Sequence, residues 1–308
     1  MTEIVAGDRR ISANGIELAY ETYGDPTATP VLLIMGLGTQ MIAWPEAFCE
    51  AIAACGHYVI RFDNRDSGLS THFRDLRAPN PVSVWFGRAK PPYTLDDLAA
   101  DTTGLMDALG LESVHLVGIS MGGFVAQTVA VTHPERLRSL TLMMTSTGSR
   151  FVGYARPRMI LNLLHRRAIT SREEAMQMAV ETFRAIGSRG YVLDEERVRD
   201  VAARSFDRGH DPGGYLRQLT AIMAQPDRTQ KLHNLELPAL VIHGRADPLV
   251  TWSGGRALAK AIPGAKLHVY PGMGHDMPRE LWPDFAAEIC ALAARGDAAW
   301  EDTRNQPR

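Results

Sequence analysis

Short apolar runs alternate with helical patterns along most of the chain. Residues 31–35 (VLLIM) are continuously apolar, as expected of a strand buried on both faces, whereas residues 16–22 (IELAYET) alternate like a half-exposed strand. We predict further strands at residues 58–62, 114–117, 137–144, 239–243 and 266–270. This order is typical of an α/β protein whose mostly parallel sheet is covered by helices.

The segments between these strands carry helical signals. Residues 95–109 are amphipathic, and Asp96 and Asp97 fall in the first turn, where carboxylates favour the helix dipole. We predict other helices at residues 44–55, 121–132, 255–261 and 281–294. The polar tail over residues 296–308 is expected to fray.

The alternation stops between about Ser146 and Leu235, where helical patterns separated by Gly- and Pro-containing turns replace it. The helices predicted there cover residues 157–167, 172–186, 195–205 and 215–224. We interpret residues 146–235 as a helical cap inserted into one α/β core, which consists of residues 1–145 and 236–308.

Composition narrows the class of protein. The 308 residues carry a formal net charge of −2, so electrostatics gives no reason to expect a nucleic-acid partner. The start of the chain lacks a signal-peptide pattern and no apolar run is long enough to cross a bilayer, so we expect a cytoplasmic protein without an integral membrane segment. Three cysteines are too few for a disulfide framework, and a reducing compartment is the expected setting.

The strongest chemical signal is the pentapeptide GISMG at residues 118–122. It follows a predicted strand directly and precedes a predicted helix. Such a sharp turn needs flanking glycines, because side chains there would collide with the neighbouring backbone. The turn would present the Ser120 hydroxyl as a nucleophile at a helix N-terminus.

A serine hydroxyl needs a base, and the base needs an orienting acid. In a strand–turn–helix setting of this type the acid and then the histidine follow the serine along the chain. Asp247 lies just past the strand ALVIH, and His275 lies just past the strand LHVY. We therefore predict Ser120 as nucleophile, Asp247 as acid and His275 as base, together at the carboxyl edge of the sheet.

Other residues fit these roles less well. No carboxylate directly follows the strand that ends at Met144, and Asp276 would point elsewhere if His275 faces the serine. His243 ends a strand, where a structural hydrogen bond is the simpler interpretation. No dinucleotide or phosphate-loop pattern and no metal-ligand spacing is present, so we expect neither a cofactor nor a metal.

The oxyanion hole should use two backbone N–H groups. One is that of Met121, the residue after the nucleophile. The other should come from the glycine-containing loop after VLLIM, where Leu37 is our prediction and Gly38 the alternative.

The substrate should lie between the serine and the cap. The apolar residues predicted to contact it are Trp44, Phe151, Met159 and Leu163. Packing under the cap is an equally good explanation for each of them.

The motifs IMGLGTQMIAW, LVGISMGG, VIHGRADPLV and PGMGHDMP resemble the α/β-hydrolase superfamily, and within it bacterial serine esterases of the aclacinomycin methylesterase-like group. The resemblance covers residues 10–295. It implies an eight-stranded, mostly parallel sheet with a helical cap after the sixth strand. It also implies that Ser120, Asp247 and His275 are catalytic, with Leu37 and Met121 at the oxyanion hole, although many members have His-Gly where this chain has Met35-Gly36.

We therefore predict a carboxylic ester hydrolase that acts through an acyl-enzyme intermediate on short- to medium-chain or methyl esters. The expected partner is a small-molecule ester, and the sequence leaves open whether the chain forms a homodimer. The alternatives are carbon–carbon bond hydrolysis, thioester hydrolysis or perhydrolysis by the same residues, and a hydrolase-fold ligand receptor with vestigial turnover.

Overall fold

The computed structural model of the chain describes residues 8–156, 159 and 169–305. Its strands form one sheet of eight, in the order β1-β2-β4-β3-β5-β6-β7-β8. The β1–β2 and β2–β4 pairs are antiparallel and the other five pairs are parallel, which confirms the predicted α/β fold class. The strands are β1 (Arg9–Ala13), β2 (Ile16–Tyr23), β3 (Pro30–Ile34), β4 (Tyr58–Phe62), β5 (Val114–Ile119), β6 (Leu137–Met143), β7 (Ala239–Gly244) and β8 (Lys266–Tyr270).

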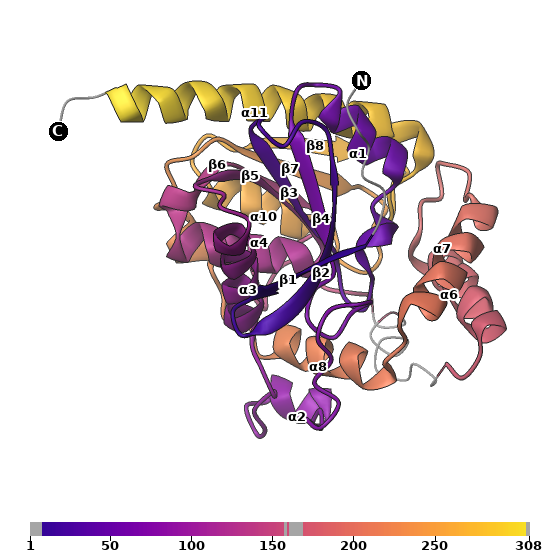
Figure 1. The fold of residues 1–308 in the computed structure, drawn as a ribbon. Coiled ribbons are helices and arrows are strands. Elements are labelled where there is room, and N and C mark those ends of the chain that lie inside the picture. The colour runs from indigo at the N-terminus through magenta and orange to yellow at the C-terminus, as the bar shows by residue number, and fades with distance from the viewer. Residues whose placement is uncertain (1–7, 157–158, 160–168, 306–308) are drawn as a thin grey trace.

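Helices cover both faces of this sheet (Figure 1). On one face lie α1 (Glu46–Ala53) and α11 (Trp282–Asn305), and on the other lie α3 (Leu95–Ala108), α4 (Met121–Thr132) and α10 (Ser253–Ala261). Within the described ranges, no helix has both the length and the apolar character that a membrane span requires.

The hydrophobic core is divided between the two faces of the sheet. The apolar run of β3 contributes to both halves, because successive side chains of a strand point to opposite sides. Leu32 and Ile34 belong to the cluster that includes residues of α3 and α4. Val31 and Leu33 belong to the cluster that includes residues of α1 and α11. This two-sided burial is the reason why the strand contains no polar position.

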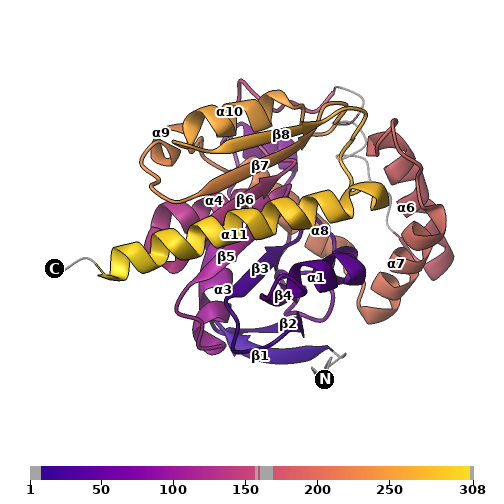
Figure 2. The same cartoon turned by 90° about the horizontal axis from the view of Figure 1, so that it is seen from above.

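In the part of the chain between β6 and β7 that the structure describes, helices alternate with irregular loops and no strand occurs. This part contains α6 (Arg172–Ile186), α7 (Glu195–Arg208), α8 (Pro212–Met223) and α9 (Thr229–Leu232). Helices α6 and α7 lie side by side at one end of the molecule in both views (Figures 1 and 2). The helix predicted at residues 157–167 falls almost wholly outside the described residues.

The prediction of a frayed tail is wrong. Helix α11 continues to Asn305 and runs along the sheet (Figure 2). Gly296 lets it approach the Arg138 carbonyl, where a Cβ atom would lie closer than 3.0 Å. The next residue, Asp297, forms an ion pair of 2.8 Å with Arg138. These contacts hold a segment whose polar composition alone suggested disorder.

Some short elements and a disulfide bond were also missed. Strand β1, helix α2 (Pro81–Trp85) and helix α9 were not predicted. Cys55, just past α1, is bonded to Cys290 of α11 across 235 residues of sequence, with a Cα–Cα distance of 6.4 Å. Only the packing of α11 against α1 brings these cysteines together, so their number and spacing gave no signal of the bond.

Candidate active site

Ser120 lies on the turn between β5 and α4. Its backbone has φ 54° and ψ −115°, a region that a side chain normally disfavours. The Ser120 N–H donates to the Met143 carbonyl at 2.9 Å, and its carbonyl accepts from Thr145 Oγ1 at 2.9 Å. The strained turn is therefore held by β6 and the residues that follow it.

Glycines permit this turn. A Cβ atom at Gly118 would lie closer than 3.0 Å to the Gly122 carbonyl, and one at Gly122 would meet the Ile34 carbonyl equally closely. A Cβ atom at Gly36 would lie 3.3 Å from Ser120 Cβ. The loop after β3 therefore lies directly beside Ser120, as the oxyanion-hole prediction requires.

The side chains of Ser120, His275 and Asp247 form one hydrogen-bonded chain. His275 Nε2 lies 3.0 Å from Ser120 Oγ, and His275 Nδ1 lies 2.7 Å from Asp247 Oδ2. His275 is 155 positions from Ser120 and 28 positions from Asp247 in sequence. The three residues nevertheless meet at the carboxyl ends of β5, β7 and β8.

Asp247 is fixed by the backbone of its own loop. Its Oδ1 accepts hydrogen bonds from the N–H groups of Leu249 and Val250, at 2.8 and 2.9 Å. Its other oxygen faces His275, and its side chain has no exposed surface. An ionised carboxylate only accepts hydrogen bonds, so Nδ1 of His275 carries the proton and Nε2 is free to accept the Ser120 hydroxyl.

The competing titratable residues lie elsewhere. Asp276 Oδ1 accepts from Ser188 Oγ at 2.5 Å. His243 is fully buried with Nδ1 3.1 Å from the Gly244 carbonyl, and burial lowers the pKa of its imidazole. His210 Nε2 lies 3.0 Å from the Ile169 carbonyl. Each of these three side chains thus has a hydrogen-bond partner other than Ser120.

Two backbone donors beside Ser120 are free. In the described part of the chain, neither the N–H of Met121 nor that of Leu37 finds an acceptor. The N–H of Gly38 instead donates to Gln218 Oε1 at 2.8 Å. Of the two donors proposed from the loop after β3, Leu37 is the available one.

Gln218 is a residue that sequence reasoning missed. It lies on α8, is fully buried, and joins the insertion to two loops of the core. Its Nε2 donates to the Arg65 carbonyl at 2.7 Å and to Ser67 Oγ at 3.0 Å, while Oε1 accepts from Gly38. No local pattern marks a lone glutamine on a helix as a support for a loop 180 residues away.

The residues predicted to contact substrate are scattered. Trp44 has no exposed surface and stacks on Phe48, and Phe151 is 87% exposed, so neither placement supports substrate contact. Met159 is buried and lines a cavity of about 540 Å³ that reaches Pro248, next to Asp247. Leu163 lies outside the described residues. The cavity is also lined by Arg156, Glu181, Arg184 and Arg189.

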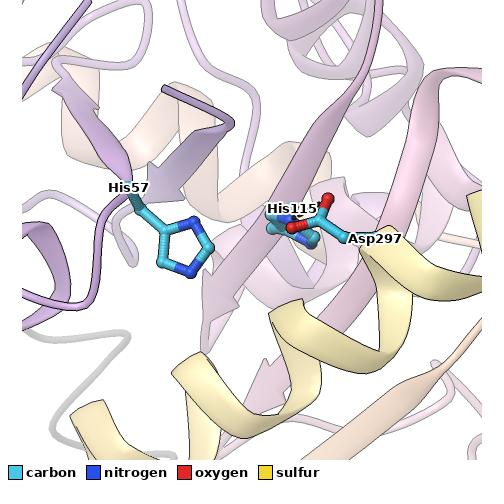
Figure 3. A group of neighbouring side chains, drawn as sticks. All are labelled: His57, His115 and Asp297. Carbon is cyan, nitrogen blue, oxygen red and sulfur yellow. Dashed lines mark ion pairs between the residues drawn. The ribbon is translucent and has the colours of Figure 1, made fainter. Parts of the chain in front are cut away.

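His57, His115 and Asp297 form a cluster between the sheet and α11 (Figure 3). Asp297 Oδ1 lies 3.2 Å from His115 Nε2 and 2.8 Å from Arg138 Nη1. His115 Nδ1 lies 2.9 Å from Ser139 Oγ. Because Arg138 already balances the carboxylate charge, these contacts favour a structural link to α11 over a metal site.

A second cluster contains Asp66, His72 and Asp211. Arg217 of α8 pairs with Asp66 at 2.7 Å and with Asp211 at 2.5 Å. A metal ion would have to displace this guanidinium from both carboxylates. We interpret the cluster as part of the attachment of α8 to the core.

The chain is similar to several known proteins. Residues 29–278 match the family described as alpha/beta hydrolase fold. Rhodomycin D methylesterase DauP of Streptomyces sp. (strain C5) is 32% identical over 307 residues, which cover 92% of this chain and 97% of that protein. Rhodomycin D methylesterase DnrP of Streptomyces peucetius is 30% identical over 304 residues, with the same shares of 92% and 97%.

A similar structure has also been solved. The crystal structure of the enol-lactonase from Burkholderia xenovorans LB400 has a TM-score of 0.73 and 25% sequence identity to this chain. The alignment covers 93% of this chain and all of that one, 100%. The similarity therefore extends over the sheet and the helices between β6 and β7.

Proposed function

The chain is a hydrolase that belongs to the α/β hydrolase fold family, and on this premise we propose that it cleaves carboxylic esters with Ser120 as the nucleophile. The observation that carries the proposal is the continuous hydrogen-bonded chain from Ser120 through His275 to Asp247. A serine in a strained turn, an imidazole beside it and a buried carboxylate behind the imidazole can together activate the hydroxyl.

The reaction has two halves. Ser120 Oγ attacks the ester carbonyl carbon while its proton moves to His275 Nε2. The carbon–oxygen bond to the alcohol then breaks, and the imidazolium returns the proton to the leaving oxygen. Water, deprotonated by the same imidazole, attacks the acyl group and releases the acid and the free serine. Asp247 stabilises the imidazolium in both halves.

The negative charge that develops on the ester carbonyl oxygen must be stabilised by hydrogen-bond donors. The N–H groups of Met121 and Leu37 are proposed to bind this oxyanion, and their lack of other acceptors in the described structure supports the role. Donors of this kind each contribute about 100- to 1000-fold in rate. Because they belong to the backbone, they are already in position when charge develops.

We propose short- to medium-chain or methyl esters as the substrates. The names of two relatives, both methylesterases, support a small alcohol as leaving group. We also propose that residues 146–235 act as a cap over this site, which the contacts of Gln218 with Gly38 support.

The test compares Ser120→Ala with Ser83→Ala, a serine of α2 with no proposed role. We expect Ser120→Ala to lose at least about 1000-fold in turnover of methyl and p-nitrophenyl esters from acetyl to palmitoyl, with unchanged thermal unfolding. Ser83→Ala should match the native enzyme. Thioester and vinylogous diketone substrates belong in the same panel, since faster turnover of either would replace the ester proposal.

A further inference from the structure

The loop that carries His275 rests on the insertion. The segment after α6 packs against residues 272–276, which follow β8. The N–H groups of Arg189 and Gly190 both donate to the Gly272 carbonyl at 3.0 Å. The N–H of His275 itself donates to the carbonyl of Ile186, the last residue of α6, at 2.8 Å.

Ser188 joins the two residues on either side of His275. Its Oγ accepts a hydrogen bond from the Gly274 N–H at 2.8 Å and donates one to Asp276 Oδ1 at 2.5 Å. One hydroxyl therefore uses its donor and an acceptor position to close a bridge around His275.

The two segments meet backbone to backbone. A Cβ atom at Gly274 would lie closer than 3.0 Å to Gly187 and to the Ile186 carbonyl. Gly190 and Gly272 are in equally close mutual contact. This leaves no space for either segment to slide, so the hydrogen bonds of Ser188 act at a fixed register.

The core supports the His275 loop on one side: the Ala246 N–H donates to the Met273 carbonyl at 2.9 Å, and the Met273 side chain is buried in the core. Among the described residues, strand β8 is the edge of the sheet and pairs only with β7. A loop beyond an edge strand lacks a neighbour on its open side, yet His275 must stay within 3.0 Å of Ser120 Oγ. The segment after α6 supplies that missing neighbour.

We propose that Ser188 and Asp276 are positioning residues for His275: Ser188 fixes the loop, and the Asp276 carboxylate anchors Ser188 and favours the imidazolium that forms during the reaction. The inference rests on the function proposed above for Ser120 and His275. The pKa of Asp276 lies above its usual value, because burial raises it most and Asp247 adds to this, while the hydrogen bonds of Ser188 and the charge of His275 lower it only in part.

The first variant is Ser188→Ala, with Thr182→Ala as the matched control. Thr182 is an exposed hydroxyl residue of α6 whose Oγ donates only to the Met178 carbonyl of its own helix. We expect Ser188→Ala to lower kcat about 10- to 100-fold with KM changed less than about 3-fold, because the base is displaced while binding is not. Ser188→Thr should restore kcat to within about 3-fold, and Thr182→Ala should leave it unchanged.

The second variant is Asp276→Asn, which retains an acceptor for Ser188 but removes the charge. The charged and titratable groups around His275 are Asp247 from the loop after β7, Asp276 from its own loop and His243 at the end of β7. With one negative charge gone, the imidazolium is less favoured, so the acid limb of the kcat/KM profile should move down by about 0.5 to 1 pH unit. A merely structural residue would leave that limb in place.

Three results would overturn the proposal: a kcat of Ser188→Ala equal to that of Thr182→Ala, a Ser188→Thr enzyme as slow as Ser188→Ala, or an unshifted acid limb in Asp276→Asn. Ser120→Ala is assayed alongside to separate the two levels of the argument. An active Ser120→Ala refutes the proposed function and with it the positioning roles. An inactive Ser120→Ala beside a full-speed Ser188→Ala refutes the positioning roles alone.

Discussion

Ser120 and His275 lie 3.0 Å apart, but they are held by different parts of the molecule. The turn that carries Ser120 contacts the sheet, through the Met143 carbonyl and the loop after β3. The loop that carries His275 contacts the insertion, through Ile186 and Ser188.

The difference separates two kinds of rigidity. Ser120 depends on close packing inside the core, where a single added carbon would displace the turn. His275 depends on hydrogen bonds between two loops, which can weaken without unfolding the sheet. Variants that add volume to the packed Ser120 turn should therefore damage both folding and rate, whereas loss of a hydrogen bond to the His275 loop should act mainly on rate.

The largest effect is expected at Gly122. In Gly122→Ala the new Cβ would overlap the Ile34 carbonyl, so either the turn or β3 must move. We expect a loss of at least about 100-fold in kcat/KM and about 2 to 3 kcal/mol in the free energy of unfolding. Kinetics and urea unfolding measure the two quantities.

Gly110→Ala is the control for this variant. Gly110 has φ +69° with open space around its Cβ position, so the change strains the backbone without a clash. It should cost about 1 kcal/mol of stability and leave kcat/KM unchanged. If Gly122→Ala behaves like Gly110→Ala, close packing does not hold Ser120.

A smaller loss is expected at Gln218, where the insertion reaches the loop after β3. Gln218→Leu keeps the volume but removes the acceptor of the Gly38 N–H and the donor to Arg65. We expect kcat to fall about 10-fold, since the Leu37 N–H loses its fixed position, with about 1 to 3 kcal/mol of stability lost. Gln177→Leu, on the exposed face of α6, should change neither kcat nor stability.

The pH dependence of kcat/KM should reflect the protonation of His275. Protonated His275 cannot accept the Ser120 proton, so kcat/KM should fall about tenfold per pH unit on the acid limb. Burial lowers the pKa of His243, so a step from that residue should come at a lower pH than that of an ordinary histidine. A profile that stays flat from about pH 5 to 8 would contradict the role of His275.

The smallest effect on rate is expected when the disulfide bond is removed, because it belongs neither to the Ser120 turn nor to the segments that hold the His275 loop. Cys290→Ser breaks the link between α11 and the segment after α1. Stability should fall by about 2 to 4 kcal/mol, because the unfolded chain regains freedom. The value of kcat should stay within about 2-fold of native, and a larger loss would show that α11 also supports the site.

Local sequence patterns predicted the turn that carries Ser120 and the helix after it well. The bounds of α4 were predicted to the residue, because the apolar strand, the glycines and Ser120 all lie within one short stretch of sequence. The order of Asp247 and His275 along the chain was sufficient to choose them among the acids and histidines present. Their catalytic roles stay a prediction until variants are measured.

The contacts between the insertion and the core could not be predicted in the same way. The helix bounds of α6 were predicted correctly, but its contacts were not. Ser188 and Gly274 are 86 residues apart, and Gln218 and Gly38 are 180 apart. Nothing in the local sequence of a polar residue indicates which distant loop it will meet, because that depends on how the helices pack.

The most direct measurement is mass-spectrometric mapping after reaction with a p-nitrophenyl alkylphosphonate. Attack by Ser120 Oγ forms an oxygen–phosphorus bond and expels p-nitrophenolate, so the adduct marks the nucleophile. We expect one adduct, on the peptide that contains Ser120, and slow labelling in His275→Ala. An enzyme that hydrolyses esters yet carries the adduct on another residue, or carries none, would contradict the central role of Ser120.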